Sequence, residues 1–276
     1  MSYKGKLNFV GLTDKGMVRP NNEDAIGVSL DTGLVIVADG MGGYKAGEVA
    51  SGIAVQTITE FVANGLKDTR KRGGVNEAGY SHESVLLRNA VSKANDIIHQ
   101  TAQSQPQCEG MGTTVVACLF YNNRVSIAHV GDSRVYRIRH GQFEQVTVDH
   151  SLLQELVSRG FYTPEEARKS LNKNLVTRAL GIEPSVQVDI QEDVVMLDDT
   201  YLLCSDGLHD MVEDPDIHLT LKTFSANLET AAQQLIKLAN DNGGRDNVSA
   251  VLARPLKSFE AHKGFFDRLT EWWFSS

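Results

Sequence analysis

Apolar residues gather in six short runs that turn residues bound on both sides. The runs are rich in β-branched and aromatic residues and predict strands at 34–38, 114–120, 125–130, 135–139, 201–204 and 248–252. The first and fifth runs end in Asp-Gly, at Asp39 and Asp206. A continuous apolar run is typical of a strand buried on both faces. A carboxylate at its end is therefore expected to be held rigidly at a cleft.

Three other segments space their apolar residues three and four apart, which predicts helices with one buried face at 47–62, 84–102 and 228–239. In the first of them the pattern places Val49 and Phe61 on the buried stripe. Asn-Gly-Gly at 242–244 is a stop signal for the third, and Thr163 and Glu166 have the spacing of a capping box. Runs of strands between separated helices predict a layered α+β domain.

The apolar pattern changes after Pro255, where we expect a boundary between a main globular domain, 1–255, and a C-terminal tail, 256–276. The tail has an apolar stripe at helical spacing, made of Phe265, Leu269, Trp272 and Trp273. A membrane-surface helix would carry Lys and Arg on its polar face, whereas this tail carries Asp267 and Glu271. We therefore expect the tail to pack on the protein's own body or on a partner.

Composition narrows the function classes. The net charge of −8 argues against a nucleic-acid-binding protein. Three cysteines without a CxxC pair indicate neither a zinc site nor a redox dithiol, and they favour a reducing compartment. The N-terminus lacks the apolar stretch of a signal peptide, and no run approaches the roughly 18 apolar residues of a spanning helix. These features predict a cytoplasmic protein.

Carboxylates recur where strands begin or end. Besides the two Asp-Gly pairs, Asp246 precedes the last predicted strand and Glu23-Asp24 lies near the start. One Asp-Gly pair is an ordinary turn, but four converging acidic segments would repel one another without a cation. Oxygen ligands without histidine or cysteine indicate magnesium or manganese. The glycine-rich segment at 40–48 fits neither the dinucleotide nor the P-loop pattern, because Lys45 and Glu48 occupy required positions.

Six motifs in order resemble the metal-dependent protein phosphatases of the type 2C class, in their bacterial form. They are Thr13-Asp14 with Arg19 and Asn22-Glu23-Asp24, then VADGMGG at 37–43, MGTT at 111–114, HVGDSR at 129–134, CSDGL at 204–208 and GRDNVS at 244–249. The resemblance covers roughly residues 8–254. It implies a central β-sandwich of two antiparallel sheets flanked by helices, a four-layer α-β-β-α arrangement with a metal site in a cleft at one end.

The resemblance also implies the ligands of two Mn²⁺ or Mg²⁺ ions. Asp39 corresponds to the aspartate that bridges both ions, and Gly40 offers a backbone carbonyl. Asp206 and Asp246 match the remaining carboxylate ligands. Glu109 stands where many bacterial members place an aspartate for a third metal, which makes it the candidate for a third ion.

Other residues receive supporting roles from the same resemblance. Arg19 matches the arginine that clamps the substrate phosphate, a task that suits a planar bidentate donor. Glu23 and Asp24 match residues that hold metal-bound waters, and Asn247 supports the neighbouring aspartate. We interpret Asp132 as structural.

The implied reaction is hydrolysis of phosphoserine and phosphothreonine in proteins by a hydroxide that bridges the two metals. Its partners would be phosphorylated proteins, including a serine/threonine kinase or the targets of such a kinase. Where some members carry a histidine as general acid, this chain has Met41 and Tyr44. The candidates for protonating the leaving group are therefore a metal-bound water, Tyr44 or a residue elsewhere. His129 and His150 are further candidates for that role, although a structural role is the simpler interpretation of each. Residues 140–181 correspond to the family's variable flap.

Two alternative functions remain open at this stage. A binding module that keeps the fold without catalysis would lack a metal aspartate, whereas Asp39, Asp206 and Asp246 are all present. Another two-metal hydrolase, such as a phosphodiesterase or nuclease, would be revealed by higher activity on bis-p-nitrophenyl phosphate than on a phosphopeptide.

Overall fold

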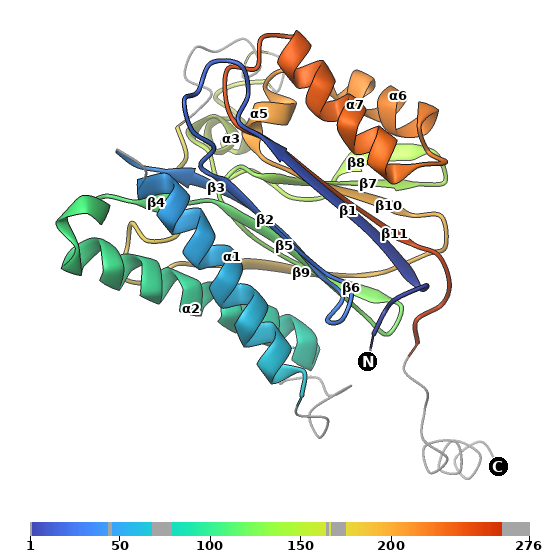
Figure 1. Cartoon of the computed structure of the whole chain (residues 1–276), viewed down its shortest axis with the longest axis horizontal. Coiled ribbons are helices and arrows are strands. Elements are labelled where there is room, and N and C mark those ends of the chain that lie inside the picture. The colour runs from blue at the N-terminus through green and yellow to red at the C-terminus, as the bar shows by residue number, and fades with distance from the viewer. Residues whose placement is uncertain (1, 44–45, 68–78, 164–165, 167–174, 261–276) are drawn as a thin grey trace.

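Two antiparallel sheets stack face to face, with helices against both outer faces (Figure 1). The computed structural model describes residues 2–43, 46–67, 79–163, 166 and 175–260. This arrangement confirms the predicted α+β fold of four layers, α-β-β-α. The predicted stripe of the tail lies outside the described residues.

The first sheet has the strand order β1-β11-β10-β7-β8. Its strands are β1 (Leu7–Asp14), β11 (Val248–Pro255), β10 (Thr200–Cys204), β7 (Arg134–Arg139) and β8 (Gln142–Gln145). The second sheet has the order β2-β3-β5-β6-β9, and the short β4 pairs with β3. Its strands are β2 (Asp24–Ser29), β3 (Leu34–Met41), β4 (Gly112–Thr113), β5 (Val115–Tyr121), β6 (Arg124–Val130) and β9 (Asp189–Val194).

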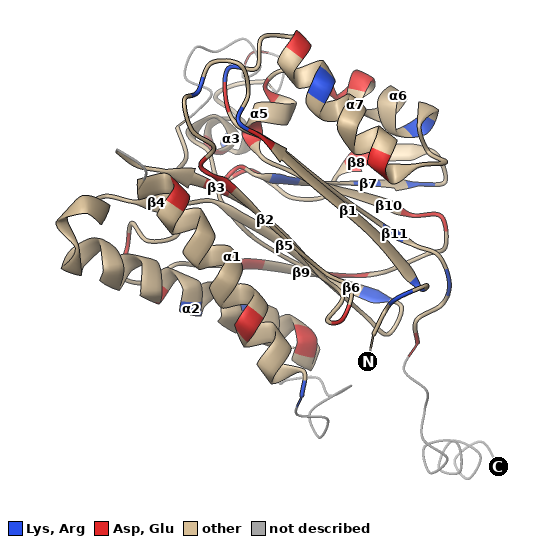
Figure 2. Cartoon of the chain, viewed as in Figure 1, with Lys and Arg blue, Asp and Glu red and all other residues tan. Residues whose placement is uncertain are grey.

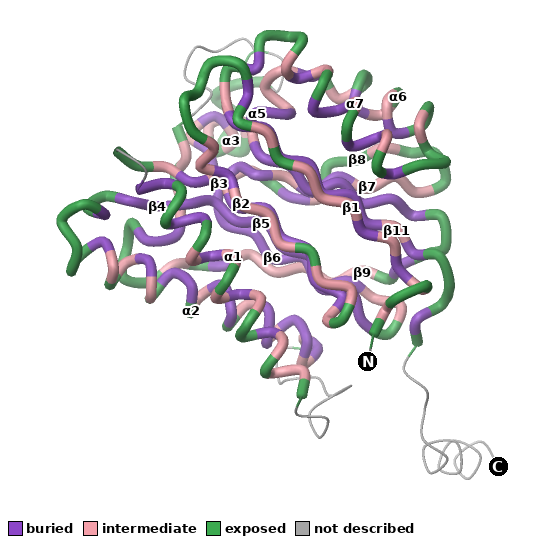
Figure 3. Tube along the Cα trace, viewed as in Figure 1, coloured by how far each residue is buried: buried purple, intermediate pink, exposed green. Residues whose placement is uncertain are grey.

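Helices cover each sheet and bury their apolar faces against it (Figure 3). The second sheet is covered by α1 (Ala46–Gly65) and α2 (His82–Ser104), and the first sheet by α5 (Asp206–His209), α6 (Asp214–Thr223) and α7 (Leu228–Asp241). The 3-10 turn η2 (Pro106–Cys108) follows α2, and α3 (Leu152–Ser158) lies in the segment after β8. Asn227 caps α7 by accepting from two backbone N–H groups.

The position of strand β3 between two cores explains why its sequence is apolar without alternation. Ile36 and Ala38 belong to the core under α1 and α2, whereas Val35 and Val37 belong to the core between the sheets. Both faces are therefore buried from Leu34 to Ala38, and the partly buried Asp39 follows directly. There the antiparallel register with β2 pairs Asp39 with Asp24, so two carboxylates lie on neighbouring strands.

The structure corrects part of the predicted helix pattern. Val49 and Phe61 are exposed, because α1 instead buries the stripe of Ala50, Ala54, Ile58 and Val62. The stop signal after the third helix is confirmed: α7 ends at Asp241, and two following glycines adopt positive φ angles. The capping box also forms, since Thr163 and Glu166 exchange hydrogen bonds between side chain and backbone N–H. Beyond the expected boundary, Phe259 is buried in the core between the sheets.

Candidate active site

Acidic residues gather at one end of the sandwich, where Figure 2 shows red segments near β3 and α5. Several of them line one cleft. Asp39 comes from the end of β3, Asp132 from the turn between β6 and β7, and Asp206 from the first position of α5. Asp246 immediately precedes Asn247 and β11. The cleft has a volume of about 350 Å³ and is lined by Arg19, Pro20, Asn21, Glu23, Asp39, Gly40, Met41, Gly42, Thr114, Asp132, Val176, Asp206, Asp246 and Asn247.

The backbone around Asp39 is fixed from both sides. Its carbonyl oxygen accepts from the Thr113 hydroxyl and from the Thr114 N–H, each at 2.8 Å. Its own N–H donates to the Thr114 hydroxyl at 3.2 Å. The next residue must be glycine, because a Cβ on Gly40 would lie 2.1 Å from the carbonyl oxygen of Gly47. These contacts hold the start of α1 against the strand end that carries the carboxylate.

Asn247 joins two segments of the chain at the cleft. Its Oδ1 accepts from the Glu23 N–H at 2.8 Å, and its Nδ2 donates to the carbonyl oxygens of Lys15 and Asn21, both at 2.9 Å. Its backbone N–H donates to Asp246 Oδ1 at 2.9 Å. The single amide therefore fixes the loop between β1 and β2 relative to the Asp246 carboxylate. This geometry supports the predicted supporting role of the residue.

Asp24 lies behind the cleft and is buried. Its Oδ2 accepts from the hydroxyls of Ser205, at 2.7 Å, and Ser249, at 2.6 Å. Within the described part of the chain, its buried Oδ1 has no hydrogen-bond partner, and the same is true of Asp206 Oδ1. Burial raises the pKa of Asp24 to about 6, although the two serine hydroxyls act in the opposite direction.

Burial and mutual repulsion raise the pKa values of the carboxylates in the cleft. Burial, followed by the charges of Asp24 and Asp206, raises the pKa of Asp39 well above its usual range. Burial and the charges of Asp132 and Asp246 do the same for Asp206, and burial raises the pKa of Asp132 to about 6. A divalent cation relieves this repulsion. The all-oxygen donor set with unpartnered carboxylate atoms therefore fits Mg²⁺ or Mn²⁺.

Arg19 stands at the rim of the cleft. Its Nη2 donates to Asp246 Oδ2 at 2.6 Å, and 54% of its side chain is exposed. The hydrogen bond to Asp246, opposed by burial, raises the pKa of Arg19. A guanidinium has five N–H donors, so Arg19 can hold Asp246 and a phosphoryl group at the same time.

Two sequence interpretations are not supported by this geometry. Glu109 is exposed between η2 and β4 and is not among the residues that line the cleft. Asp132, interpreted above as structural, does line it. The signal was present in the HVGDSR motif, whose aspartate directly follows the buried strand β6 and a glycine with positive φ, Gly131.

The residues considered for the general-acid role differ in whether they line the cleft. Met41 lines the cleft but has no acidic proton, and Tyr44 lies outside the described residues. His129 Nε2 bonds the carbonyl oxygen of Val148 at 2.9 Å, and His150 Nδ1 accepts from the Gly131 N–H at 3.1 Å. Neither histidine lines the cleft. Both hydrogen bonds hold the segment that follows β8 against the end of β6, which agrees with the structural interpretation.

Clustered carboxylates and an arginine at one end of a double-sheet sandwich define the class of metal-dependent phosphohydrolases. Residues 18–253 match the family model described as protein phosphatase 2C. The serine/threonine phosphatase stp of Listeria welshimeri is 39% identical over 243 residues, which make up 87% of this chain and 92% of that protein.

Solved structures agree with the sequence comparison. The Mycobacterium tuberculosis serine/threonine phosphatase PstP/Ppp matches with a TM-score of 0.81 and 37% identity, over 91% of this chain and 99% of that chain. The catalytic domain of PstP in complex with two manganese ions matches with a TM-score of 0.77 and 37% identity, over 90% and 98% of the two chains.

The chain belongs to the protein phosphatase 2C family. This finding confirms the predicted resemblance, the predicted enzyme class of metal-dependent protein-serine/threonine phosphatase, and the predicted dependence on Mn²⁺ or Mg²⁺. In the part of the chain that the structure describes, no helix is long and apolar enough to cross a membrane.

Proposed function

We propose that Asp39, Asp206 and Asp246, together with the backbone carbonyl of Gly40, would hold the two divalent cations of a phosphoprotein phosphatase. The observation that carries this assignment is the convergence of three strand-end carboxylates in one cleft with Arg19 at its rim. Asp132 adds another carboxylate to the same cleft, and its charge acts together with burial, the larger cause, in raising the pKa of both Asp39 and Asp206. It replaces Glu109 as the candidate for a third ion.

When bound, the two cations supply an acidified water for attack on phosphorus and neutralise charge on the phosphoryl group. The chain's own residues position the reactants. Arg19 clamps the phosphoryl oxygens through its planar guanidinium, and its bond to Asp246 keeps that clamp beside the cation ligands. Glu23, whose backbone is fixed by Asn247, turns toward the same cleft and orients water there.

The substrates we propose are proteins phosphorylated on serine or threonine by a kinase that this enzyme opposes. The relatives support this proposal, because those reported above are named serine/threonine phosphatases. A cytoplasmic location is part of the proposal. It is supported by the three cysteines, all of which are unpaired and buried.

Calorimetric titration with Mn²⁺, combined with kinetics on a phosphothreonine peptide, tests the assignments. We expect Asp206→Asn and Asp246→Asn each to weaken metal binding, and Arg19→Ala to raise KM with metal binding retained. Glu109→Gln is the matched control, because it removes an exposed carboxylate outside the cleft and should change neither quantity. Wild-type metal affinity in Asp206→Asn, or a loss of affinity in Glu109→Gln, would show that the ligand set is wrong.

A further inference from the structure

Two large apolar side chains are exposed immediately before Arg19. Met17 is 70% exposed and Val18 is 66% exposed. Single exposed apolar residues are ordinary on protein surfaces. These two are adjacent, however, and they directly precede the residue that we place on the substrate phosphate. We call Met17 and Val18 the apolar ledge.

The backbone of the ledge is held in place. The N–H groups of Met17 and Val18 donate to the carbonyl oxygen of Gly244 at 2.8 and 3.2 Å. Gly16, with φ of +76°, comes so close to the Asp246 segment that a Cβ would lie 2.2 Å from the Asp246 carbonyl oxygen. The loop therefore cannot withdraw its apolar side chains without disturbing the segment that carries Asp246.

A packing role accounts for only part of the ledge. The Cγ of Met17 lies 2.7 Å from the place where a Cβ on Gly244 would stand, so this side chain covers that glycine. Most of the Met17 side chain nevertheless faces solvent, and so does Val18. Fixed, exposed apolar surface beside a catalytic cleft is typical of a recognition surface.

We infer that the apolar ledge binds an apolar side chain of the phosphoprotein substrate, within two residues of the phosphorylated serine or threonine. Residues of an extended peptide are about 3.3 Å apart, so a phosphate held by Arg19 brings its near neighbours to the ledge. Val176 lines the cleft and the neighbouring Leu175 is 53% exposed, so further apolar surface borders the same site. This inference rests on the proposed role of Arg19.

The experiment compares three substrates in the presence of Mn²⁺: a phosphothreonine peptide with Ile or Leu on both sides of the phosphothreonine, the same peptide with Ser there, and p-nitrophenyl phosphate. The variant is the double substitution Met17→Ser, Val18→Ser. Leu219→Ser is the matched control, because Leu219 is 61% exposed like the ledge but belongs to α6 and not to the loop that carries Arg19.

The measured quantity is the ratio of kcat/KM on the Ile/Leu peptide to kcat/KM on p-nitrophenyl phosphate. We expect this ratio to be about tenfold lower in the double variant than in the wild type. A tenfold change matches the free energy of burying roughly 55 Å² of apolar surface, the contact area that the substitutions would remove. The Ser peptide should lose less than twofold, and Leu219→Ser should change no ratio. An equal loss on all three substrates would overturn the inference, because it would mean that the substitutions damage the cleft itself. No loss on the Ile/Leu peptide would overturn it as well.

The wild-type enzyme separates failure of this inference from failure of the proposed site. Metal-dependent turnover of p-nitrophenyl phosphate without any preference for the Ile/Leu peptide would contradict the ledge alone. Absence of metal-dependent turnover on every substrate would contradict the proposed site, and the ledge with it.

Discussion

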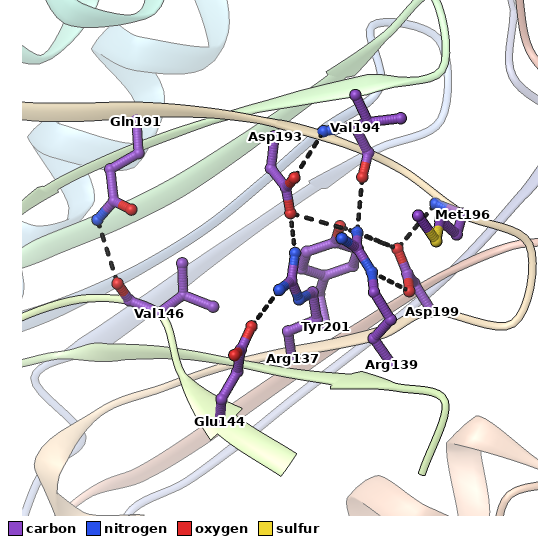
Figure 4. A network of polar contacts seen from close by, with 10 residues as sticks. All are labelled: Arg137, Arg139, Glu144, Val146, Gln191, Asp193, Val194, Met196, Asp199 and Tyr201. Carbon is purple, nitrogen blue, oxygen red and sulfur yellow. Dashed lines mark hydrogen bonds and ion pairs between the residues drawn. The ribbon is translucent and has the colours of Figure 1, made fainter. Parts of the chain in front are cut away.

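Substituting Arg139 with Met should destabilise the protein strongly, because it leaves a buried carboxylate without its cation. Arg139 of β7 donates through Nε to Asp199 Oδ1 at 2.9 Å and through Nη2 to Asp199 Oδ2 at 2.7 Å (Figure 4). Asp199 is only 1% exposed. The neighbouring Arg137 pairs with Glu144 of β8 and with Asp193 of β9, so the network ties the two sheets together.

The magnitude follows from what remains around Asp199. Removing one partner of a buried ion pair typically costs about 3–5 kcal/mol. The Met196 N–H, at 2.8 Å, and the Tyr201 hydroxyl, at 3.3 Å, still donate to Asp199 Oδ2 after the substitution. We therefore expect the lower end, a loss of about 3 kcal/mol. For a chain of this size, that loss lowers the Tm by roughly 6–12 °C.

Urea unfolding and thermal melting of Arg139→Met measure this loss directly. Lys237→Ala is the matched control, because Lys237 forms an ion pair with Asp241 on α7 in which both side chains are more than half exposed. Exposed pairs of this kind contribute less than about 0.5 kcal/mol. The double variant Arg139→Met, Asp199→Asn should regain part of the lost stability, because it removes the isolated charge.

A loss below about 1 kcal/mol in Arg139→Met, comparable to that of Lys237→Ala, would refute this reasoning. It would mean that water or another cation compensates Asp199 once Arg139 is gone.

Two further predictions concern the start of α1 and the buried His150. Gly40→Ala should destabilise the protein in urea unfolding and weaken Mn²⁺ binding in calorimetry, because the new Cβ would collide with the Gly47 carbonyl. Gly52→Ala is the control. A Cβ at this position in α1 meets open space, so this substitution should raise stability by about 0.5–1 kcal/mol in the same unfolding assay. Burial, then the charge of His129, lowers the pKa of His150 to about 4. Since the unfolded chain binds that proton near pH 6.5, stability should fall by up to about 2 kcal/mol as the pH falls from 6.5 to 4, after allowance for partial solvent screening. An NMR titration in which the His150 ring protonates near pH 6.5 would contradict this.

The elements found from the sequence are those whose burial is most complete. Runs such as those of β3 and β10 are apolar throughout, because one face meets helices and the other face meets the opposite sheet. Strands β1, β2 and β9 lie at sheet edges and are mostly half-exposed, so polar residues interrupt their pattern. The short helices α3, α5 and α6 offer too few turns for a clear helical period.

The candidate site was largely predictable, because its carboxylates follow or precede the most apolar strands. Asp39, Asp206 and Asp246 share this signal, and the structure brings them into one cleft. Glu109 is a candidate only through the family resemblance, which gives weight to its place just before MGTT. The chain changes direction between the two, where Gly110 has a φ of +72°, and Glu109 stays exposed. Sequence spacing cannot report such a turn, and it equally missed that Asp132 faces the cleft.

Phosphate release from a phosphothreonine peptide tests the central claim most directly. The assay compares wild-type protein with Mn²⁺, wild-type protein with EDTA, and Asp206→Asn with Mn²⁺. We predict turnover in the first case, and a loss of at least a hundredfold in the other two, because both remove a cation from the cleft. Turnover that persists in EDTA, or that is unchanged in Asp206→Asn, would contradict a reaction at the two-metal centre formed by these carboxylates.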